Sequence, residues 1–194
     1  MASTQVKWLD DVEKKPAPEP LRRVQSLINT IDRESGLDRL AVAENAAPWM
    51  TSNGLLAPGG TPTDGDLQTL VGVREGLRAL VLQNTDGQAP DPAVVSPLHQ
   101  LTEGEVARAA VAEDGSVGLA PVGDSVRARL LTLLLVIADA QHDGTWAHLL
   151  ACANDDCQWV FYDRSRNHGG TWCDMATCGN KLKNRDFRAR ARKR

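Results

Sequence analysis

The chain has 194 residues, of which 42% are hydrophobic and 24% charged, and its formal net charge is −3. This composition is typical of a globular protein and excludes an intrinsically disordered one. The charge is unevenly distributed: residues 151–194 hold ten Lys and Arg against five Asp, which gives +5 and leaves −8 for residues 1–150. A polyanionic partner is therefore expected to bind at the C-terminal end.

The N-terminal quarter predicts a leader and two helices. Residues 1–20 are expected to form a loose leader, because they are charged and three prolines interrupt regular structure. Apolar residues at helical spacing then predict an amphipathic helix over 21–34, whose apolar stripe fits either the core or a dimer interface. A second helix is predicted over 38–47, ending before Pro48.

Two further helices are predicted in the middle of the chain. Thr63 is expected to cap a helix that runs to about Leu82. Gly72 and Gly76 weaken this helix but leave room for close packing. Asp91, followed by a proline, opens a short helix that Pro97 is expected to bend or end.

The next segments predict a β-hairpin and a buried helix. Residues 106–112 and 117–122 flank Asp114-Gly115, a dipeptide typical of hairpin turns. A long helix is predicted over 124–142, and a short one over 146–150 leads to the first cysteine. The longest apolar run, 130–138, is about half the length that a membrane-spanning helix needs.

The four cysteines have the spacing of a metal site. The first residues of the chain contain no apolar region typical of a secretory signal, so we expect a cytoplasmic protein. Thiols stay reduced in that compartment, which favours metal binding over disulfides. Two C-x4-C pairs separated by 15 residues can supply the four tetrahedral ligands of a structural Zn²⁺. These ligands are Cys152, Cys157, Cys173 and Cys178.

A catalytic metal is not expected at this site. Four thiolates close the coordination shell, whereas a catalytic zinc keeps an open position for water. His148 and His168 lie nearby in the sequence and are expected to be exposed or capping residues. The sequence also lacks GxSxG, P-loop and HExxH motifs, so we expect no enzyme activity.

The C-terminal tail is strongly basic. Residues 179–194 hold eight Lys and Arg and one Asp. A helix is predicted from Lys181 onward, and it would place several cations on one face for contact with phosphates. The alternative is a solvated tail that only improves solubility.

The residues around the cysteines also carry a family resemblance. Their pattern is Cys152-x4-Cys157-x3-Phe161-x-Asp163-x-Ser165-Arg166-Asn167-x4-Trp172-Cys173-x-Met175-x2-Cys178-Gly179-Asn180. This pattern resembles the CGNR zinc finger of bacterial proteins. The segment LINTID at 27–32 is similar to the ABATE domain that usually precedes this finger. The resemblance implies a stress-induced bacterial transcription regulator with a DNA-binding finger.

Two positions depart from the family pattern. Gly170-Thr171 stands where the family has two basic residues, and Lys181 replaces the arginine that gives the motif its final letter. Arg166 and Asn167 have two open interpretations: they contact nucleic acid, or Arg166 pairs with Asp163 and Asn167 forms a left-handed turn. The residues expected to contact nucleic acid are Arg164, Arg166, Asn167, Asn180, Lys181, Lys183, Arg185, Arg188 and Arg192.

The predicted fold class is mainly α (α+β). A loose leader (1–20) precedes a helical ABATE-like domain with one β-hairpin (21–150), and a small treble-clef-like zinc finger ends in a basic helix (151–194). The predicted function is a zinc-binding, DNA-binding transcription regulator of the cytoplasm or nucleoid, whose N-terminal domain dimerises or senses a small-molecule effector. The alternative is a zinc-scaffolded adaptor that binds protein or RNA. No membrane partner is expected.

Overall fold

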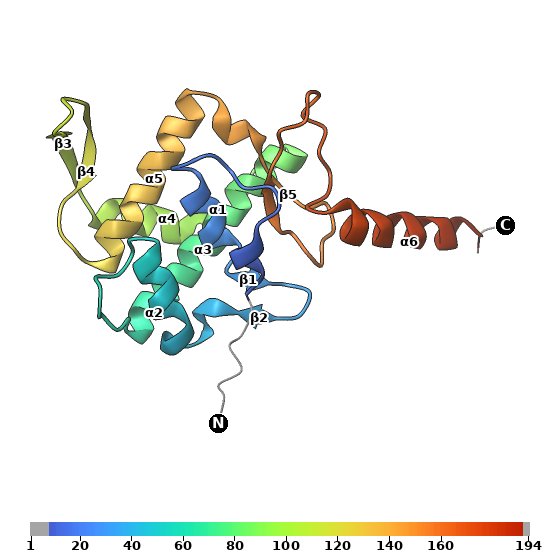
Figure 1. The fold of residues 1–194 in the computed structure, drawn as a ribbon, viewed down its shortest axis with the longest axis horizontal. Coiled ribbons are helices and arrows are strands. Elements are labelled where there is room, and N and C mark those ends of the chain that lie inside the picture. The colour runs from blue at the N-terminus through green and yellow to red at the C-terminus, as the bar shows by residue number, and fades with distance from the viewer. Residues whose placement is uncertain (1–7, 192–194) are drawn as a thin grey trace.

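Helix α3 (Asp64–Asp86) is the central element of the computed structural model, which describes residues 8–191. Figure 1 shows how the other helices of the N-terminal body surround it. They are α1 (Arg22–Ile28), α2 (Ala43–Ser52), α4 (Pro92–Gly104) and α5 (Val126–His142). The core between them contains Leu70 and Leu77 of α3 and Leu130 of α5, all fully buried. With its small hairpins, the molecule confirms the predicted mainly helical α+β class.

Helix α1 is shorter than predicted. It ends at Ile28 because the buried Asn29 turns to another segment: its Nδ2 donates to the Val160 carbonyl at 2.8 Å, and its Oδ1 accepts from the Val160 amide at 2.9 Å. The chain then forms a small antiparallel hairpin, β1 (Ile31–Asp32) and β2 (Leu37–Asp38). The apolar stripe of α1 lies in the core, so it is not available as a dimer interface.

Pro48 and Pro97 do not end the helices that contain them, α2 and α4. A 3-10 turn (Arg39–Ala41) precedes α2, and α2 continues through Pro48 to bury Trp49 and Met50. Burial of these two side chains offsets the one hydrogen bond that proline cannot donate. Likewise α4 continues beyond Pro97 to Gly104.

The α3–α4 contact explains the two glycines of α3. A Cβ on Gly72 would lie 3.2 Å from Pro97, and one on Gly76 would lie 2.9 Å from Leu98. The contact at Gly76 is too short for a Cβ atom, and the one at Gly72 would require Pro97 to shift slightly. Glycine at these two positions therefore allows the close packing of α3 and α4. The predicted start of α3 is also confirmed, since Thr63 and Asp66 form a reciprocal capping box.

The C-terminal segments form a second small hairpin. A 3-10 turn (Thr145–His148) leads into β5 (Leu149–Ala151), which pairs antiparallel with β6 (Val160–Tyr162). The helix predicted over 146–150 is therefore wrong beyond His148. A π-helical turn (Met175–Gly179) precedes α6 (Asn180–Ala191), which extends away from the body in Figure 1.

The predicted β-hairpin of the middle segment is confirmed as β3 (Ala107–Val111) and β4 (Val117–Pro121). In Figure 1 it projects from the side of the body opposite to α6. Within the described part of the chain, no helix is both long and apolar enough to span a bilayer.

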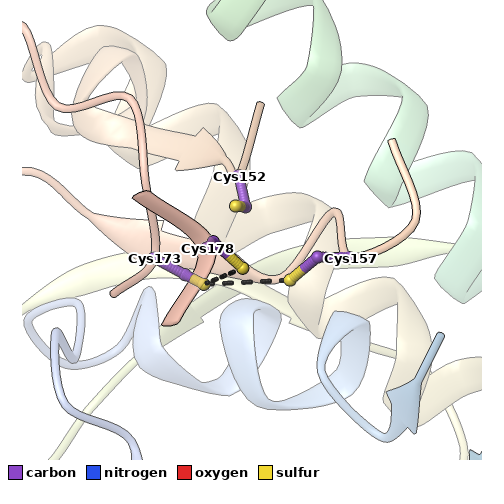
Figure 2. A group of neighbouring side chains, drawn as sticks. All are labelled: Cys152, Cys157, Cys173 and Cys178. Carbon is purple, nitrogen blue, oxygen red and sulfur yellow. Dashed lines mark hydrogen bonds between the residues drawn. The ribbon is translucent and has the colours of Figure 1, made fainter. Parts of the chain in front are cut away.

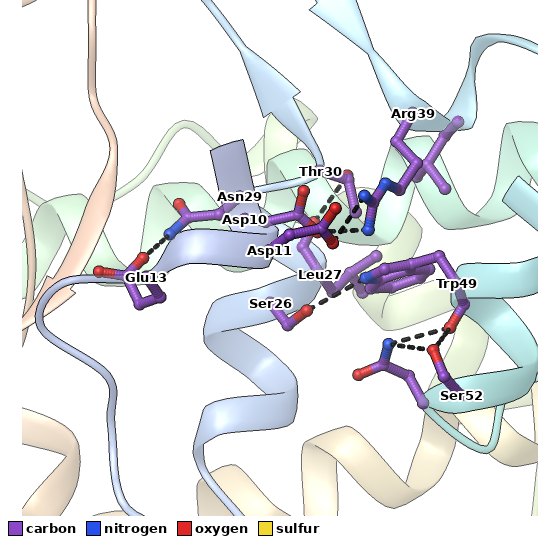
Figure 3. Close-up of polar contacts among 12 residues, drawn as sticks. Asp10, Asp11, Glu13, Ser26, Leu27, Asn29, Thr30, Arg39, Trp49 and Ser52 are labelled. Carbon is purple, nitrogen blue, oxygen red and sulfur yellow. Dashed lines mark hydrogen bonds and ion pairs between the residues drawn. The ribbon is translucent and has the colours of Figure 1, made fainter. Parts of the chain in front are cut away.

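Residues 8–20, called the strap below, lie against the body, which differs from the loose leader expected for 1–20. A 3-10 turn (Leu9–Val12) places Asp10 and Asp11 at 2.9 and 2.8 Å from the Arg39 guanidinium (Figure 3). The Arg39 guanidinium also lies over the Trp8 ring. Arg39 is buried, and its Nε has no partner among the described residues. The ion pairs thus attach the strap to the turn before α2. Residues 1–7 lie outside the described range.

Asp10 gives this attachment a pH dependence. Burial raises the pKa of Asp10 from 3.8 to about 6, and the Arg39 charge only partly offsets this effect. Between pH 4 and 6 the unfolded carboxyl is ionised while the folded one keeps its proton, so stability falls as the pH rises through this window. We expect wild type to lose on the order of 2 kcal/mol relative to Asp10→Asn between pH 4 and 6, measured by urea unfolding. Parallel pH profiles of the two proteins would contradict this expectation.

Candidate metal centre

Four cysteine sulfurs converge beside the β5–β6 hairpin, and Figure 2 shows all four side chains pointing toward one another. Their Sγ atoms lie within 4.8 Å of one another. The Cys173 Sγ is 3.8 Å from that of Cys157 and 3.7 Å from that of Cys178. All four cysteines are free, and among the described side chains no His, Asp or Glu joins the cluster.

These distances fit a single tetrahedral ion. Zinc–thiolate bonds of 2.3 Å in tetrahedral geometry place the sulfurs about 3.8 Å apart, whereas a disulfide requires about 2.05 Å. Two of the four side chains, Cys152 and Cys178, are buried, so the donors face a protected space. The cluster therefore has the donor set and spacing of a metal site.

The first pair of cysteines is held by a tight backbone turn, residues 152–158. The Cys152 amide donates to the Trp159 carbonyl at 2.9 Å, and the Cys157 amide donates to the Asn154 carbonyl at 2.8 Å. Gln158 takes a left-handed conformation with φ of 47°. This turn brings both sulfurs to the same side of the hairpin.

The second pair is held by the π-helical turn. Asp174 caps this turn by accepting from the Ala176 amide at 2.8 Å. A Cβ on Gly179 would overlap the Met175 side chain and lie 3.1 Å from Trp172. The glycine that follows Cys178 therefore lets the turn close on the metal ligands.

The protonation of the sulfurs reflects their crowding. Contacts with Cys157, and then with Cys173, hold the pKa of Cys152 far below its ordinary value. The contact with Cys152 in turn raises the pKa of Cys157, and that of Cys173 is raised for the same reason. One sulfur can carry a charge while its neighbours keep their protons. A divalent cation would displace these protons, so metal affinity should rise with pH.

The N-terminal body supports the hairpin that carries the first pair. Besides Asn29, Gln25 donates to the Val160 carbonyl at 3.1 Å. Arg78 of α3, also buried, donates to the carbonyl of Gln158 at 3.0 Å and to that of Ile28 at 2.8 Å. Val160 and Tyr162 belong to the same hydrophobic core as α3. The metal centre is therefore continuous with the helical body.

The strap supports the centre from the other side. Glu13 accepts from the Trp159 indole at 2.8 Å and from Asn29 at 3.1 Å (the latter pair is visible in Figure 3). Lys14 pairs with Asp174, the residue that caps the π-helical turn. Lys15 donates to the Trp172 carbonyl at 2.6 Å and lies over the Phe161 ring. The strap thus contacts both halves of the cysteine cluster.

A cleft of about 240 Å³ lies between the strap and the cluster. Its lining includes Val12, Trp159 and Thr177 as well as Cys157 and Cys173. It provides an entry path for a metal ion, which a site closed on all sides would lack.

Three of the residues expected to contact nucleic acid have partners within the protein. Arg164 donates to the Pro16 carbonyl at 3.1 Å. Asn180 donates to the Ala176 carbonyl at 3.3 Å. Lys181 forms an ion pair of 2.7 Å with Glu34, which also accepts from Asn154. Glu34, in the β1–β2 turn, therefore links the start of α6 to the body.

The remaining expected contacts are exposed or lie beyond the described side chains. Arg166 and Asn167 are exposed in the loop after β6, and Lys183 and Arg185 are exposed on α6. For Arg188 only the helical backbone is described, and Arg192 lies outside the described residues. The structure does not bring the loop pair and the α6 pair into direct contact with each other.

Asp163 braces the loop after β6 through hydrogen bonds from backbone amides, and not through the ion pair with Arg166 that the sequence suggested. Burial opposes ionisation of Asp163, but hydrogen bonds from the Ser165 and Gly170 amides lower its pKa. No ion pair with Arg166 is present among the described side chains, and His168 rather than Asn167 takes the left-handed conformation, with φ of 45°. His168 stacks on His148 at 4.0 Å between ring centroids, away from the sulfurs.

Gly170 is fixed by the same carboxylate. A Cβ at this position would lie 2.8 Å from Asp163 Oδ2 and 3.1 Å from the Phe161 ring. A basic side chain at Gly170 would therefore displace Asp163, whereas the neighbouring Thr171 is exposed. In this conformation a basic side chain fits at position 171 but not at position 170.

Sequence reasoning missed the residues that hold the finger on the body. These are Glu13, Lys14, Lys15, Gln25, Asn29, Glu34 and Arg78. The sequence held one signal for two of these residues. Gln25 and Asn29 lie next to the apolar residues of the α1 stripe, which indicates that they face the interior and not the solvent.

The cluster and its surroundings define the class of protein. A four-cysteine metal site made by a tight turn and a helical turn, and followed by a helix, is a zinc-finger-type module. Comparison with known families agrees: residues 148–191 match the CGNR zinc finger, and residues 21–151 match ABATE, described as a putative stress-induced transcription regulator. The chain belongs to the ABATE family and carries a CGNR zinc finger. No curated protein matches it.

Proposed function

We propose that this protein is a zinc-dependent, DNA-binding regulator that acts in the cytoplasm through its C-terminal helix. The observation that carries the proposal is the position of α6. The helix begins directly after the last cysteine and its glycine, and it extends away from the body (Figure 1). Lys183 and Arg185 on it are exposed. The family matches support a regulatory role.

Zinc is the metal we propose for the cluster. Thiolate ligands favour zinc among the common divalent metals, and four of them in tetrahedral spacing give a closed structural site. With no open position for water, the ion would have no catalytic role, and we propose none for the protein. The ion would hold Cys178, and with it the first turn of α6, at a fixed distance from the β5–β6 hairpin.

Exposed cations on two segments support contact with phosphates. Lys183 and Arg185 project from α6, and Arg166 lies in the loop between the two cysteine pairs. Residues 179–194 together carry eight Lys and Arg against one Asp. Such a surface attracts the DNA backbone and releases its counterions, which makes binding dependent on salt. Lys181 would act through its ion pair with Glu34, by orienting the helix.

The salt dependence provides the test. We expect the zinc-loaded protein to bind duplex DNA in fluorescence anisotropy, with log K falling linearly with log salt concentration. Replacing Lys183 and Arg185 together with glutamine should reduce the steepness of that slope by about 1.8, because two phosphate contacts are removed.

The matched control is Arg22→Gln, an exposed arginine at the start of α1 in the helical body. It should leave the slope unchanged. Absence of binding to any duplex at low salt would contradict the proposal, and stoichiometric binding of RNA or of a protein in its place would favour an adaptor. An unchanged slope in the double variant would remove α6 from the interface.

A further inference from the structure

The β3–β4 hairpin, with the residue on either side of it, carries more exposed large hydrophobic side chains than any other element of the described chain. Of the eleven large hydrophobic side chains that are exposed in residues 8–185, five lie on this hairpin. They are Val106, Val111, Val117, Leu119 and Val122, which are between 44% and 73% exposed. A two-stranded hairpin is marginally stable by itself, so an uncovered one of this composition requires an explanation.

The hydrogen-bond pattern shows which edge of the hairpin is free. Outside the strands, the Ala112 amide donates to the Ser116 carbonyl and the Val122 amide to the Val106 carbonyl. Bonded and non-bonded pairs alternate in an antiparallel ladder, so the even-numbered residues of β3 bond to β4. The odd-numbered residues 107, 109 and 111 therefore direct their N–H and C=O groups away from β4.

The two outer edges of the hairpin are not equivalent. On β4, the residue opposite Ala107 is Pro121, which has no N–H to donate at that edge. Strand β4 also contacts α5. The β3 edge has a complete set of donors and acceptors, and Figure 1 shows it on the outside of the molecule. It lacks the prolines and bulges that commonly protect an edge strand.

We propose that two copies of this chain associate by antiparallel pairing of their β3 edges about a twofold axis, which forms a four-stranded sheet. The charges on the strand favour a second copy as the occupant. Arg108 lies near one end and Glu113-Asp114 at the other; all three are exposed, and none forms an ion pair with a described residue. Antiparallel pairing centred near Ala110 brings each Arg108 toward the acidic turn of the partner.

This association is independent of the proposed DNA contact. The hairpin and α6 lie at opposite sides of the molecule (Figure 1), so a dimer made through β3 leaves both C-terminal helices exposed. It also replaces the dimer interface that the apolar stripe of α1 suggested, since that stripe is buried in the core.

The experiment compares two proline variants by sedimentation equilibrium of the zinc-loaded full chain. Ala109→Pro removes an N–H of the free β3 edge that makes no bond to β4, so the hairpin itself can persist. We expect wild type to form dimers and Ala109→Pro to raise the dimer dissociation constant at least a hundredfold. Val117→Pro removes an N–H from the β4 edge and should change it less than threefold. Circular dichroism and zinc content confirm that both variants are folded.

A charge swap tests the register. Arg108→Glu should weaken the dimer about tenfold by placing like charges together, and adding Glu113→Arg should restore it. Wild type that remains monomeric at its highest soluble concentration would overturn the proposal and leave the β3 edge to a strand of another protein. A dimer that Ala109→Pro leaves intact would also overturn it.

Discussion

Replacing Cys178 with serine is expected to remove the metal and release α6 from the body. The Cys178 sulfur lies 3.7 Å from that of Cys173 and forms one corner of the tetrahedron. Structural zinc sites contribute about 10–16 kcal/mol of apparent binding free energy, which exceeds the net stability of most domains. Loss of one of the four thiolates should therefore lower zinc affinity at least a thousandfold and lower the melting temperature.

Metal analysis and thermal unfolding check this prediction. Wild type should contain one zinc per chain, and the variant none after dialysis against a chelator that wild type withstands. The matched control is Thr177→Ser. Thr177 is an exposed neighbour of Cys178, and its hydroxyl forms no hydrogen bond to a cysteine sulfur among the described side chains. A Cys178→Ser protein that retains one zinc per chain and melts like wild type would show that the four sulfurs do not share an ion.

The second large effect is expected from Arg39→Met. The Arg39 side chain is 7% exposed and that of Asp10 is 5% exposed, so the substitution leaves a buried carboxylate without its partner. Breaking a buried ion pair in this way costs about 3–5 kcal/mol. The strap, whose attachment to the body depends on this pair, should become open to tryptic cleavage after Lys14, whereas the Lys15–Pro16 bond resists trypsin.

Arg129→Met is the control for this effect. Arg129 also forms an ion pair, but its partner Asp124 is 98% exposed, and such surface pairs contribute about 0–1 kcal/mol. Urea unfolding at neutral pH measures both variants, and limited proteolysis reports on the strap. If Arg39→Met costs no more than Arg129→Met, the Asp10–Arg39 pair does not hold the strap.

The metal ligands could be predicted from the sequence because their chemistry is local and their number is small. Four cysteines in two closely spaced pairs allow few arrangements, and Cys152 and Cys178 lie in the cluster as expected. The capping box of α3 and the β3–β4 hairpin could be predicted for the same reason, since Thr63 and Asp114-Gly115 act on neighbouring residues.

The remainder depended on partners that are distant in the chain. Leu149 and Leu150 have a pattern that suits a helix, but they form a strand because Phe161 and Tyr162 lie beside them once the cysteine turn has formed. Asn29 ends α1 early through bonds to Val160. The spacing of apolar residues along the chain does not predict such long-range hydrogen bonds, because a polar side chain such as Asn29 could equally well face the solvent.

The strap also constrains the order in which the molecule can be completed. Its residues are made early, but their partners are made late: Lys14 meets Asp174 after 160 positions, and Glu13 meets Trp159 after 146. Contacts of such separation form only when most of the chain is available, and they are the slowest to form. We therefore expect the strap to be the last segment to pack, although the ribosome delivers it before the elements it joins.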